Sequence, residues 1–149
     1  MLDSLKNIAI GSDHAGFMLK EYLKEYLQSQ HYTIIDFGTN SEDSVDYPDY
    51  IHPLADAINK GVYDKAVIIC GTGNGVAMVA NKYRMVRACV CWSDEVTRLS
   101  RQHNNANIIA LPARFITQEQ GLEFLRIFLH TDFEGGRHTR RIEKISQIL

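Results

Sequence analysis

Short β-rich runs alternate with longer segments of helical periodicity along the chain, and this alternation constrains the fold more than any other feature. The runs are rich in Ile, Val or Ala and are apolar on both alternating faces, as buried parallel strands are. They are residues 7–11, 33–37, 66–70, 88–92 and 107–111. Right-handed crossovers wind such strands into an open sheet with helices on both faces. We therefore predict an α/β fold, namely a Rossmann-like, doubly wound, five-stranded parallel sheet in three layers (α/β/α) with a C-terminal helix.

The helical segments carry their own start signals. Leucines and a tyrosine repeat at helical spacing after Gly16, Ser93 is a predicted N-cap, and Thr117 with Gln120 forms a predicted capping box for a helix through residue 129. We expect further helices over residues 53–60 and 139–148. The 149 residues, of which 45% are hydrophobic, suffice for one domain, spanning 1–149.

The charge balance excludes two classes of partner. Sixteen Lys and Arg against eighteen Asp and Glu give a formal net charge of -2, so no overall basic field is present to hold a nucleic acid or an anionic membrane.

Apolar runs stay short of the roughly 18 residues that a membrane-spanning helix requires. The first residues lack the pattern of a signal peptide, so we expect a cytoplasmic protein.

A glycine-rich loop follows the third predicted strand, at residues 70–75 (C-G-T-G-N-G). Ligands of open α/β sheets bind beyond the carboxyl ends of the strands, and backbone N–H groups at a helix start attract anions. The loop could therefore hold a phosphate, or the oxyanion of a sugar that loses a proton from carbon. A tight turn that merely permits close packing is the alternative interpretation.

Two nucleotide-binding interpretations fit this loop less well. A P-loop requires Gly-Lys-Ser or Gly-Lys-Thr after a four-residue gap, and neither occurs. A dinucleotide fingerprint requires glycine at position 76, which is Val76, although Asp94 after the next strand could contact a ribose. A nucleotide-binding regulatory module thus stays open as an alternative.

Cys70 is the distinctive residue of the loop. The positive potential at the start of a helix favours the thiolate form of a cysteine, which could then act as a base. A free cysteine is equally typical of a buried core, and the sequence alone leaves both roles open. Cys89 and Cys91 have no such loop and are predicted to be core residues.

The histidines and arginines give further candidates. No H-E-x-x-H motif or other closely spaced ligand pair occurs, so we expect no metal site. His14 follows the first strand and should face the glycine loop, whereas His103 lies between a helix and the fifth strand, where it could simply be a helix-end cation. Arg137 and Arg141 share one face at the start of the last helix, as a phosphate clamp or as a solvated basic face.

Six motifs are spread along the chain: G-S-D-H-A-G, D-Y-P-D-Y, C-G-T-G-N-G, A-N-K, R-Q-H-N-N-A-N and E-G-G-R-H-T-R-R. Together they resemble the type B ribose-5-phosphate isomerases, a family that includes allose- and galactose-6-phosphate isomerases. The resemblance implies an isomerase of the pentose phosphate pathway that interconverts ribose 5-phosphate and ribulose 5-phosphate through an enediolate, without cofactor or metal. A hexose 6-phosphate isomerase of the same family is the alternative.

The resemblance also implies roles for individual residues. Cys70 would be the base, Thr72 would assist at the sugar oxygens, and His103 would open the furanose ring as an acid. The implied substrate-binding residues are Asp13, His14, Tyr47, Gly71, Gly73, Asn74, Gly75, Asn104, Arg114, Arg137 and Arg141. Among them Asp13, Tyr47 and Asn104 would hold hydroxyls, whereas His14 and the three arginines would bind the phosphate. Active sites would be shared between the subunits of a homodimer or tetramer, with the C-terminal arginines serving a neighbour.

The chain departs from the family pattern at a few positions. One branch of the family uses a glutamate of the loop in place of the cysteine, and Val76 stands at that position here, which favours Cys70 as the base. Met85 replaces a turn glycine away from the expected site, and Ala113 replaces glycine or serine beside Arg114.

Overall fold

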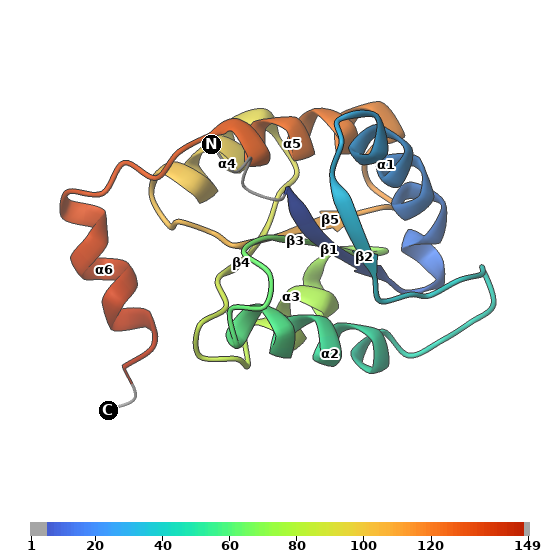
Figure 1. Ribbon diagram of the computed structural model, residues 1–149, viewed down its shortest axis with the longest axis horizontal. Helices are drawn as coiled ribbons and strands as arrows, with labels where there is room; N and C mark the ends of the chain where they lie inside the picture. Colours follow the sequence, from blue (N-terminus) through green and yellow to red (C-terminus); the bar gives the residue numbers. More distant parts are fainter. Residues whose placement is uncertain (1–5, 148–149) are drawn as a thin grey trace.

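The computed structural model describes residues 6–147 and contains all five predicted strands. They are β1 (Asn7–Ser12), β2 (Thr33–Asp36), β3 (Ala66–Cys70), β4 (Ala88–Val90) and β5 (Ile108–Pro112). Every pair is parallel, in the order β2-β1-β3-β5-β4 (Figure 1). The expectation that all five strands are buried on both faces is wrong for β2 and β4, which are partly exposed because each lies at an edge of the sheet.

Six α-helices and one 3-10 turn complete the described part of the chain. They are η1 (His14–Gly16), α1 (Phe17–Ser29), α2 (Tyr47–Asn59), α3 (Asn74–Ala80), α4 (Asp94–Gln102), α5 (Gln118–His130) and α6 (Arg137–Ile145). The predicted cap of Ser93 and the capping box of Thr117 with Gln120 are both confirmed. Within residues 6–147 no helix is both long enough and apolar enough to cross a membrane.

Two helices have boundaries that differ from the prediction. α2 begins at Tyr47 and not at residue 53, because Pro48 occupies the first turn, which needs no backbone N–H, and Pro53 is tolerated on an exposed face inside the helix. α6 begins at Arg137, two residues earlier than expected. It ends at Ile145, before the predicted end at residue 148, which itself lies outside the described residues.

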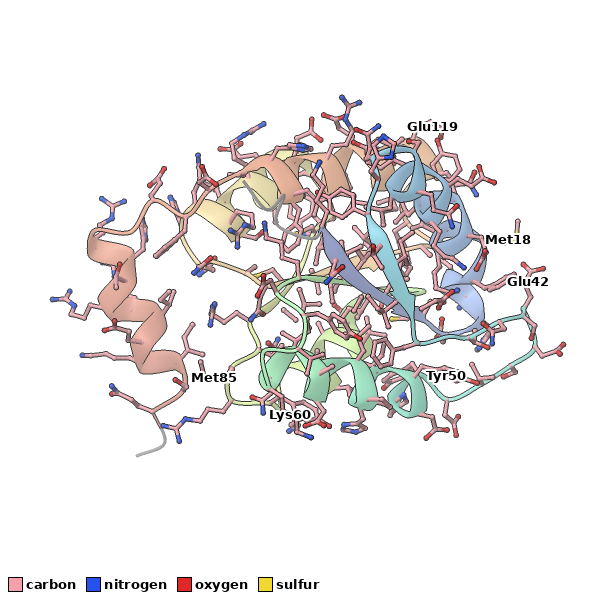
Figure 2. The ribbon with its side chains drawn as sticks, in the orientation of Figure 1. Met18, Glu42, Tyr50, Lys60, Met85 and Glu119 are labelled. Atoms are coloured by element: carbon pink, nitrogen blue, oxygen red, sulfur yellow. The ribbon has the colours of Figure 1, made fainter. Side chains whose placement is uncertain are left out.

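The helices form two layers that sandwich the sheet. Residues of alternating orientation along each central strand divide between two apolar clusters: Ile8 and Ile10 pack with α1 and α5, whereas Ala9 and Cys70 pack with α2 and α3. Figures 1 and 2 show these layers on opposite sides of the sheet, with α4 beside α5 and with side chains filling both interlayer spaces. α6 stands apart from both layers at one end of the molecule.

Backbone hydrogen bonds tie together the segments that leave the carboxyl ends of the central strands. The Asp13 amide donates to the Ile69 carbonyl at 3.2 Å, and the Arg114 amide donates to the Gly71 carbonyl at 3.1 Å. The residues that follow β1, β3 and β5 therefore form one continuous rim. This rim is where an open α/β sheet binds ligands.

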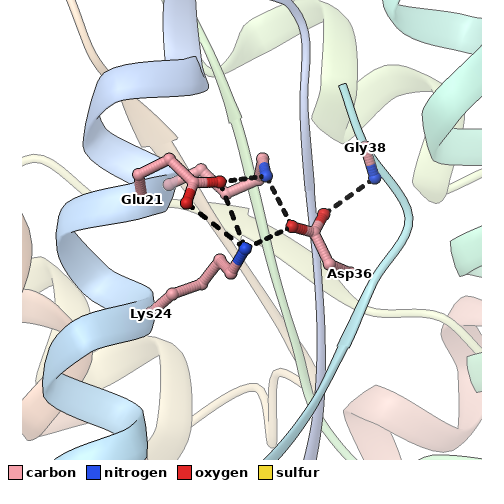
Figure 3. A network of polar contacts seen from close by, with 5 residues as sticks. Glu21, Lys24, Asp36 and Gly38 are labelled. Carbon is pink, nitrogen blue, oxygen red and sulfur yellow. Dashed lines mark hydrogen bonds and ion pairs between the residues drawn. The ribbon is translucent and has the colours of Figure 1, made fainter. Parts of the chain in front are cut away.

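A partly buried ion-pair network fixes the end of β2 relative to α1 (Figure 3). The Lys20 side chain is fully buried, and its Nζ lies 2.7 Å from Asp36 Oδ2 and 2.9 Å from Glu21 Oε1. Lys24 Nζ also binds Asp36, at 2.8 Å, and the other Asp36 oxygen accepts a hydrogen bond from the Gly38 amide at 2.8 Å. The network thereby anchors the start of the loop that leads to Tyr47.

Candidate active site

A hollow of about 640 Å³ lies on the rim formed by the carboxyl ends of the strands. Its lining includes five of the predicted site residues, namely Asp13, His14, Tyr47, Gly71 and Arg114. The remaining lining residues come from η1, the loop after β2 and the start of α2. The structure therefore brings these five predicted residues together at one place, and their roles there stay predictions.

Asp13 and His14 owe their positions to the turn that follows β1. Asp13 Oδ1 accepts hydrogen bonds from the amides of Ala15 at 2.9 Å and Gly16 at 3.2 Å, so this carboxylate caps η1. His14 Nδ1 accepts a hydrogen bond from the Val45 amide at 3.2 Å. Because Nδ1 is the acceptor, Nε2 carries the proton of the neutral ring and is available as a donor to a ligand.

Of the glycine loop, Gly71 lines the hollow, and the residues after it lead into α3. Gly73 has a φ of +74°, a conformation that favours glycine, and a Cβ there would approach Val90 Cγ1 at 3.2 Å. The Thr72 hydroxyl accepts a hydrogen bond from the Asn74 amide at 3.2 Å, and Gly75 lies against the ring of Tyr47. The loop is thus a shaped turn whose glycines are required by close neighbours.

Cys70 is the last residue of β3 and its side chain is only 5% exposed. The thiol belongs to the apolar cluster beneath α2 and α3, while Gly71, the next residue, lines the hollow. Arg114 covers Gly71, since a Cβ at residue 71 would lie 3.2 Å from Arg114 Cδ. Cys70 is therefore adjacent in the chain to the lining of the hollow but is not itself among the lining residues.

The other two cysteines have the predicted core character. Cys91 is fully buried in the apolar cluster between the sheet and helices α1 and α5. Cys89 is half-buried and packs against that cluster. Burial raises the pKa of Cys89 to about 11 and also raises the pKa of Cys91. Neither thiol ionises readily near neutral pH.

Four predicted site residues lie elsewhere, at the opposite edge of the sheet. His103 caps the C-terminal end of α4, and Asn104 lines a second hollow of about 470 Å³ with Ile145 of α6. Arg137 and Arg141 lie on α6. Because α4 begins at the carboxyl end of β4, its last turn lies at the amino ends of the strands. A single chain therefore does not bring these four residues to the hollow beside Gly71.

His103 has two neighbours that sequence reasoning did not assign to a site. Its ring stacks on that of His138, with centroids 4.2 Å apart and an angle of 15° between the planes, and Glu134 Oε2 lies 3.8 Å from His138 Nε2. The three side chains could each offer a ligand atom within 4.8 Å of the others. Stacked imidazoles direct their nitrogen lone pairs in nearly parallel planes, so in this arrangement they do not converge on one ion.

The nucleotide interpretation is not supported by the topology. In a dinucleotide site the acidic residue follows the strand next to the glycine loop. Here β5 separates β3 from β4, and Asp94, at the start of α4, lines a separate hollow with Trp92 and Glu119. Asp94 therefore does not face the glycine loop.

An open parallel sheet with a hollow beyond its strand ends, bordered by a glycine loop, defines a small-molecule-binding α/β protein. Comparison with known proteins narrows this class. The family model described as Ribose/Galactose Isomerase matches residues 8–145. The probable ribose-5-phosphate isomerase B of Mycoplasma genitalium is 43% identical over 141 residues, covering 93% of each chain.

Solved structures agree with this similarity. A ribose 5-phosphate isomerase from Thermotoga maritima superposes with a TM-score of 0.93 at 47% identity, covering 95% of this chain and 98% of its own. Ribose-5-phosphate isomerase B from Mycoplasma genitalium with bound ribulose-5-phosphate has a TM-score of 0.90 at 42% identity. This match covers 94% of the present chain and 93% of the Mycoplasma chain. The chain therefore belongs to the ribose/galactose isomerase family. It is an isomerase with the Rossmann-like fold of that family.

Proposed function

We propose that this protein interconverts ribose 5-phosphate and ribulose 5-phosphate as an enzyme of the pentose phosphate pathway in the cytoplasm. The observation that carries the proposal is the hollow beside Gly71. It combines hydroxyl-binding and phosphate-binding side chains in a fold shared with a relative that holds ribulose-5-phosphate.

The chemistry assigned to the loop is a proton transfer between neighbouring carbons. Cys70 removes the proton from C2 of the open-chain aldose and returns it to C1, while the O2 proton moves to O1. The enediolate between these steps carries negative charge on a sugar oxygen, and the amides of residues 71–75 stabilise it. Thr72 assists at the same oxygens. The position of Cys70 next to Gly71 supports this assignment.

Asp13 and Tyr47 bind the sugar hydroxyls, and His14 and Arg114 bind the phosphate. The protonated Nε2 of His14 and the guanidinium of Arg114 are both donors on the lining of the hollow, which suits an anion. The same arrangement requires neither a metal nor a cofactor for the proton transfer.

We also propose that a second copy of the chain completes each site. His103, Asn104, Arg137 and Arg141 lie away from the hollow, so a two-fold pairing can supply them to the partner's glycine loop. The arrangement of α6 supports this pairing: it stands apart from both helix layers (Figure 1), with His138 as its buried residue and with Ile145 59% exposed. In the partner's site His103 opens the furanose ring, Asn104 holds a hydroxyl and the two arginines bind the phosphate.

Turnover of several sugar phosphates tests the proposal. We expect ribose 5-phosphate to be converted faster than allose 6-phosphate or galactose 6-phosphate, whereas a preference for either hexose would reassign the substrate. Replacing a placed base removes about 10²- to 10⁴-fold in rate, so Cys70→Ala should lose about that much turnover and still bind substrate. Cys89→Ala is the matched control, and equal turnover of the two variants would exclude Cys70 as the base.

A further inference from the structure

The loop that carries His103 is held by a buried arginine. Arg101 Nη1 donates to Asn105 Oδ1 at 2.9 Å and to the Ala106 carbonyl at 2.6 Å. Arg101 Nε donates to the carbonyl of Thr131, in the segment that leads to α6, at 3.1 Å. The backbone of His103 is therefore fixed relative to the segment that approaches it from α5.

The side chain of His103 is oriented by a different contact. Among residues 6–147 its ring makes no hydrogen bond, and its defining neighbour is the ring of His138, stacked at 4.2 Å. Thirty-five positions separate the two residues in the sequence, so the contact depends on where α6 begins. The stack covers one face of the His103 imidazole and restricts rotation of that ring.

His138 is itself well fixed. Only 6% of it is exposed, and it is the buried residue of α6. Burial, together with the neighbouring His103 and Arg137, lowers the pKa of His138, and the opposing effect of Glu134 does not reverse the shift. The lowered pKa favours the neutral form of His138, and a neutral ring can stay stacked on a neighbour that takes up a proton.

We infer that His138 is a positioning residue for the isomerase reaction, because its stacked ring holds the His103 imidazole in the orientation that ring opening requires. The inference rests on the role of His103 proposed above and adds a residue that has no contact with the substrate in that proposal. Glu134 Oε2 lies 3.8 Å from His138 Nε2, on the same side of the molecule as the stack.

Ring opening makes a strict demand on geometry. The C1–O4 bond of the furanose breaks, the O1 proton leaves, O4 gains a proton, and C1 becomes the aldehyde carbon. An imidazole transfers such a proton only when its nitrogen is within hydrogen-bonding distance and aligned with the sugar oxygen. An unstacked His103 at the end of α4 would populate several rotamers, and most of them would be unproductive.

A double-mutant cycle tests the inference directly. His138→Ala should lower kcat for ribose 5-phosphate by about tenfold to a hundredfold. This loss is smaller than the full rate enhancement of a positioned acid, because His103 is still present but less well oriented. The same substitution in a His103→Ala background should cost less than twofold, because no imidazole is left to orient. His138→Phe keeps a flat ring and should restore most of the lost turnover. His130→Ala, on the exposed end of α5, is the matched control and should leave kcat unchanged.

A second measurement isolates the step. Ribulose 5-phosphate has no furanose form because O5 carries the phosphate, so exchange of its C1 hydrogen with D₂O does not use ring opening. We expect His138→Ala to retain this exchange within about twofold of wild type while net conversion to ribose 5-phosphate falls.

The inference would be overturned if His138→Ala lowered kcat by the same factor in the wild-type and His103→Ala backgrounds. It would also be overturned if the His138→Phe enzyme had no higher kcat than His138→Ala. Failure of the wild-type protein to convert ribose 5-phosphate would instead overturn the proposed function, so the two failures are distinguishable.

Discussion

The ring of Tyr47 lies so close to Gly75 that a Cβ at residue 75 would be 2.6 Å from Tyr47 Cζ and 2.9 Å from its hydroxyl oxygen. Tyr47 is the first residue of α2, and Gly75 is in the first turn of α3. The contact therefore sets the spacing between these two helices at the mouth of the hollow. It also places a phenol hydroxyl against the glycine loop, where a sugar hydroxyl can reach it.

Gly75→Ala should displace the Tyr47 ring. We expect a loss of about 1–3 kcal/mol in the free energy of unfolding, typical of overpacking. We also expect a rise in KM, because Tyr47 would leave the position in which the proposed function has it bind the sugar. Urea unfolding and steady-state kinetics measure the two effects. In a Tyr47→Ala background the same substitution should cost little, and equal costs in both backgrounds would show that the contact is not the cause.

The network around Lys20 gives a prediction about stability. Asp36→Asn leaves the fully buried Lys20 ammonium with Glu21 as its remaining ion-pair partner, so we expect a loss of about 2–4 kcal/mol in the free energy of unfolding. Asp56→Asn, which removes the exposed pair with Lys60, is the matched control and should have no measurable effect. Equal stability of the two variants would contradict a structural role for the network.

The same network predicts a dependence on pH. Burial opposes ionisation of Asp36, but hydrogen bonds from Lys20 and Lys24 and from the Gly38 amide outweigh it, so its pKa lies below the ordinary value. The stabilisation is therefore complete above the ordinary carboxyl pKa and is lost as the pH falls through the lowered one. The difference in stability between wild type and Asp36→Asn should shrink in acid, as measured by urea unfolding from pH 6 to pH 3.

The proposed sharing of the site between two copies predicts complementation. Cys70→Ala damages the glycine-loop half of the site and His103→Ala damages the other half, so each variant alone should have little activity. Random mixing of subunits should restore about a quarter of the wild-type rate, because half of the dimers are mixed and each mixed dimer has one intact site. Mixing Cys70→Ala with Tyr47→Ala, which damages the same half, should restore nothing, and recovery there would contradict the division.

Local signals in the sequence predict much of the fold. Ser93 and the pair Thr117–Gln120 cap helices as expected, because a cap depends on residues two or three positions apart. The start of α2 is missed because Pro53 resembles a helix start, whereas Pro48 is the proline of the first turn. The carboxyl-end rule likewise places Asp13, Gly71 and Arg114 together before any coordinates are known.

Local sequence patterns predict less about the residues around His103, which the proposed function assigns to a partner's site. His103 lies at a helix end, away from the strand ends, and only the family resemblance identifies it as a candidate. The stack with His138 and the approach of Glu134 depend on the path of the segment between α5 and α6, which no local pattern specifies. The motif E-G-G-R-H places His138 beside Arg137, and that adjacency to a predicted site residue is the one sequence signal that points to His138.

Cys89 gives the last prediction. Burial and the neighbouring Cys91 raise its pKa to about 11, with Arg87 opposing the shift, so above pH 9 the unfolded chain releases the thiol proton while the folded chain retains it. Stability must therefore fall as the pH rises from 9 to 11, by about 2–3 kcal/mol for a shift of two pKa units. Urea unfolding of wild type and Cys89→Ala between pH 8 and pH 10.5 isolates this contribution, since other groups titrate in both proteins. A parallel pH dependence of the two proteins would show that Cys89 ionises as freely in the folded chain as in the unfolded one.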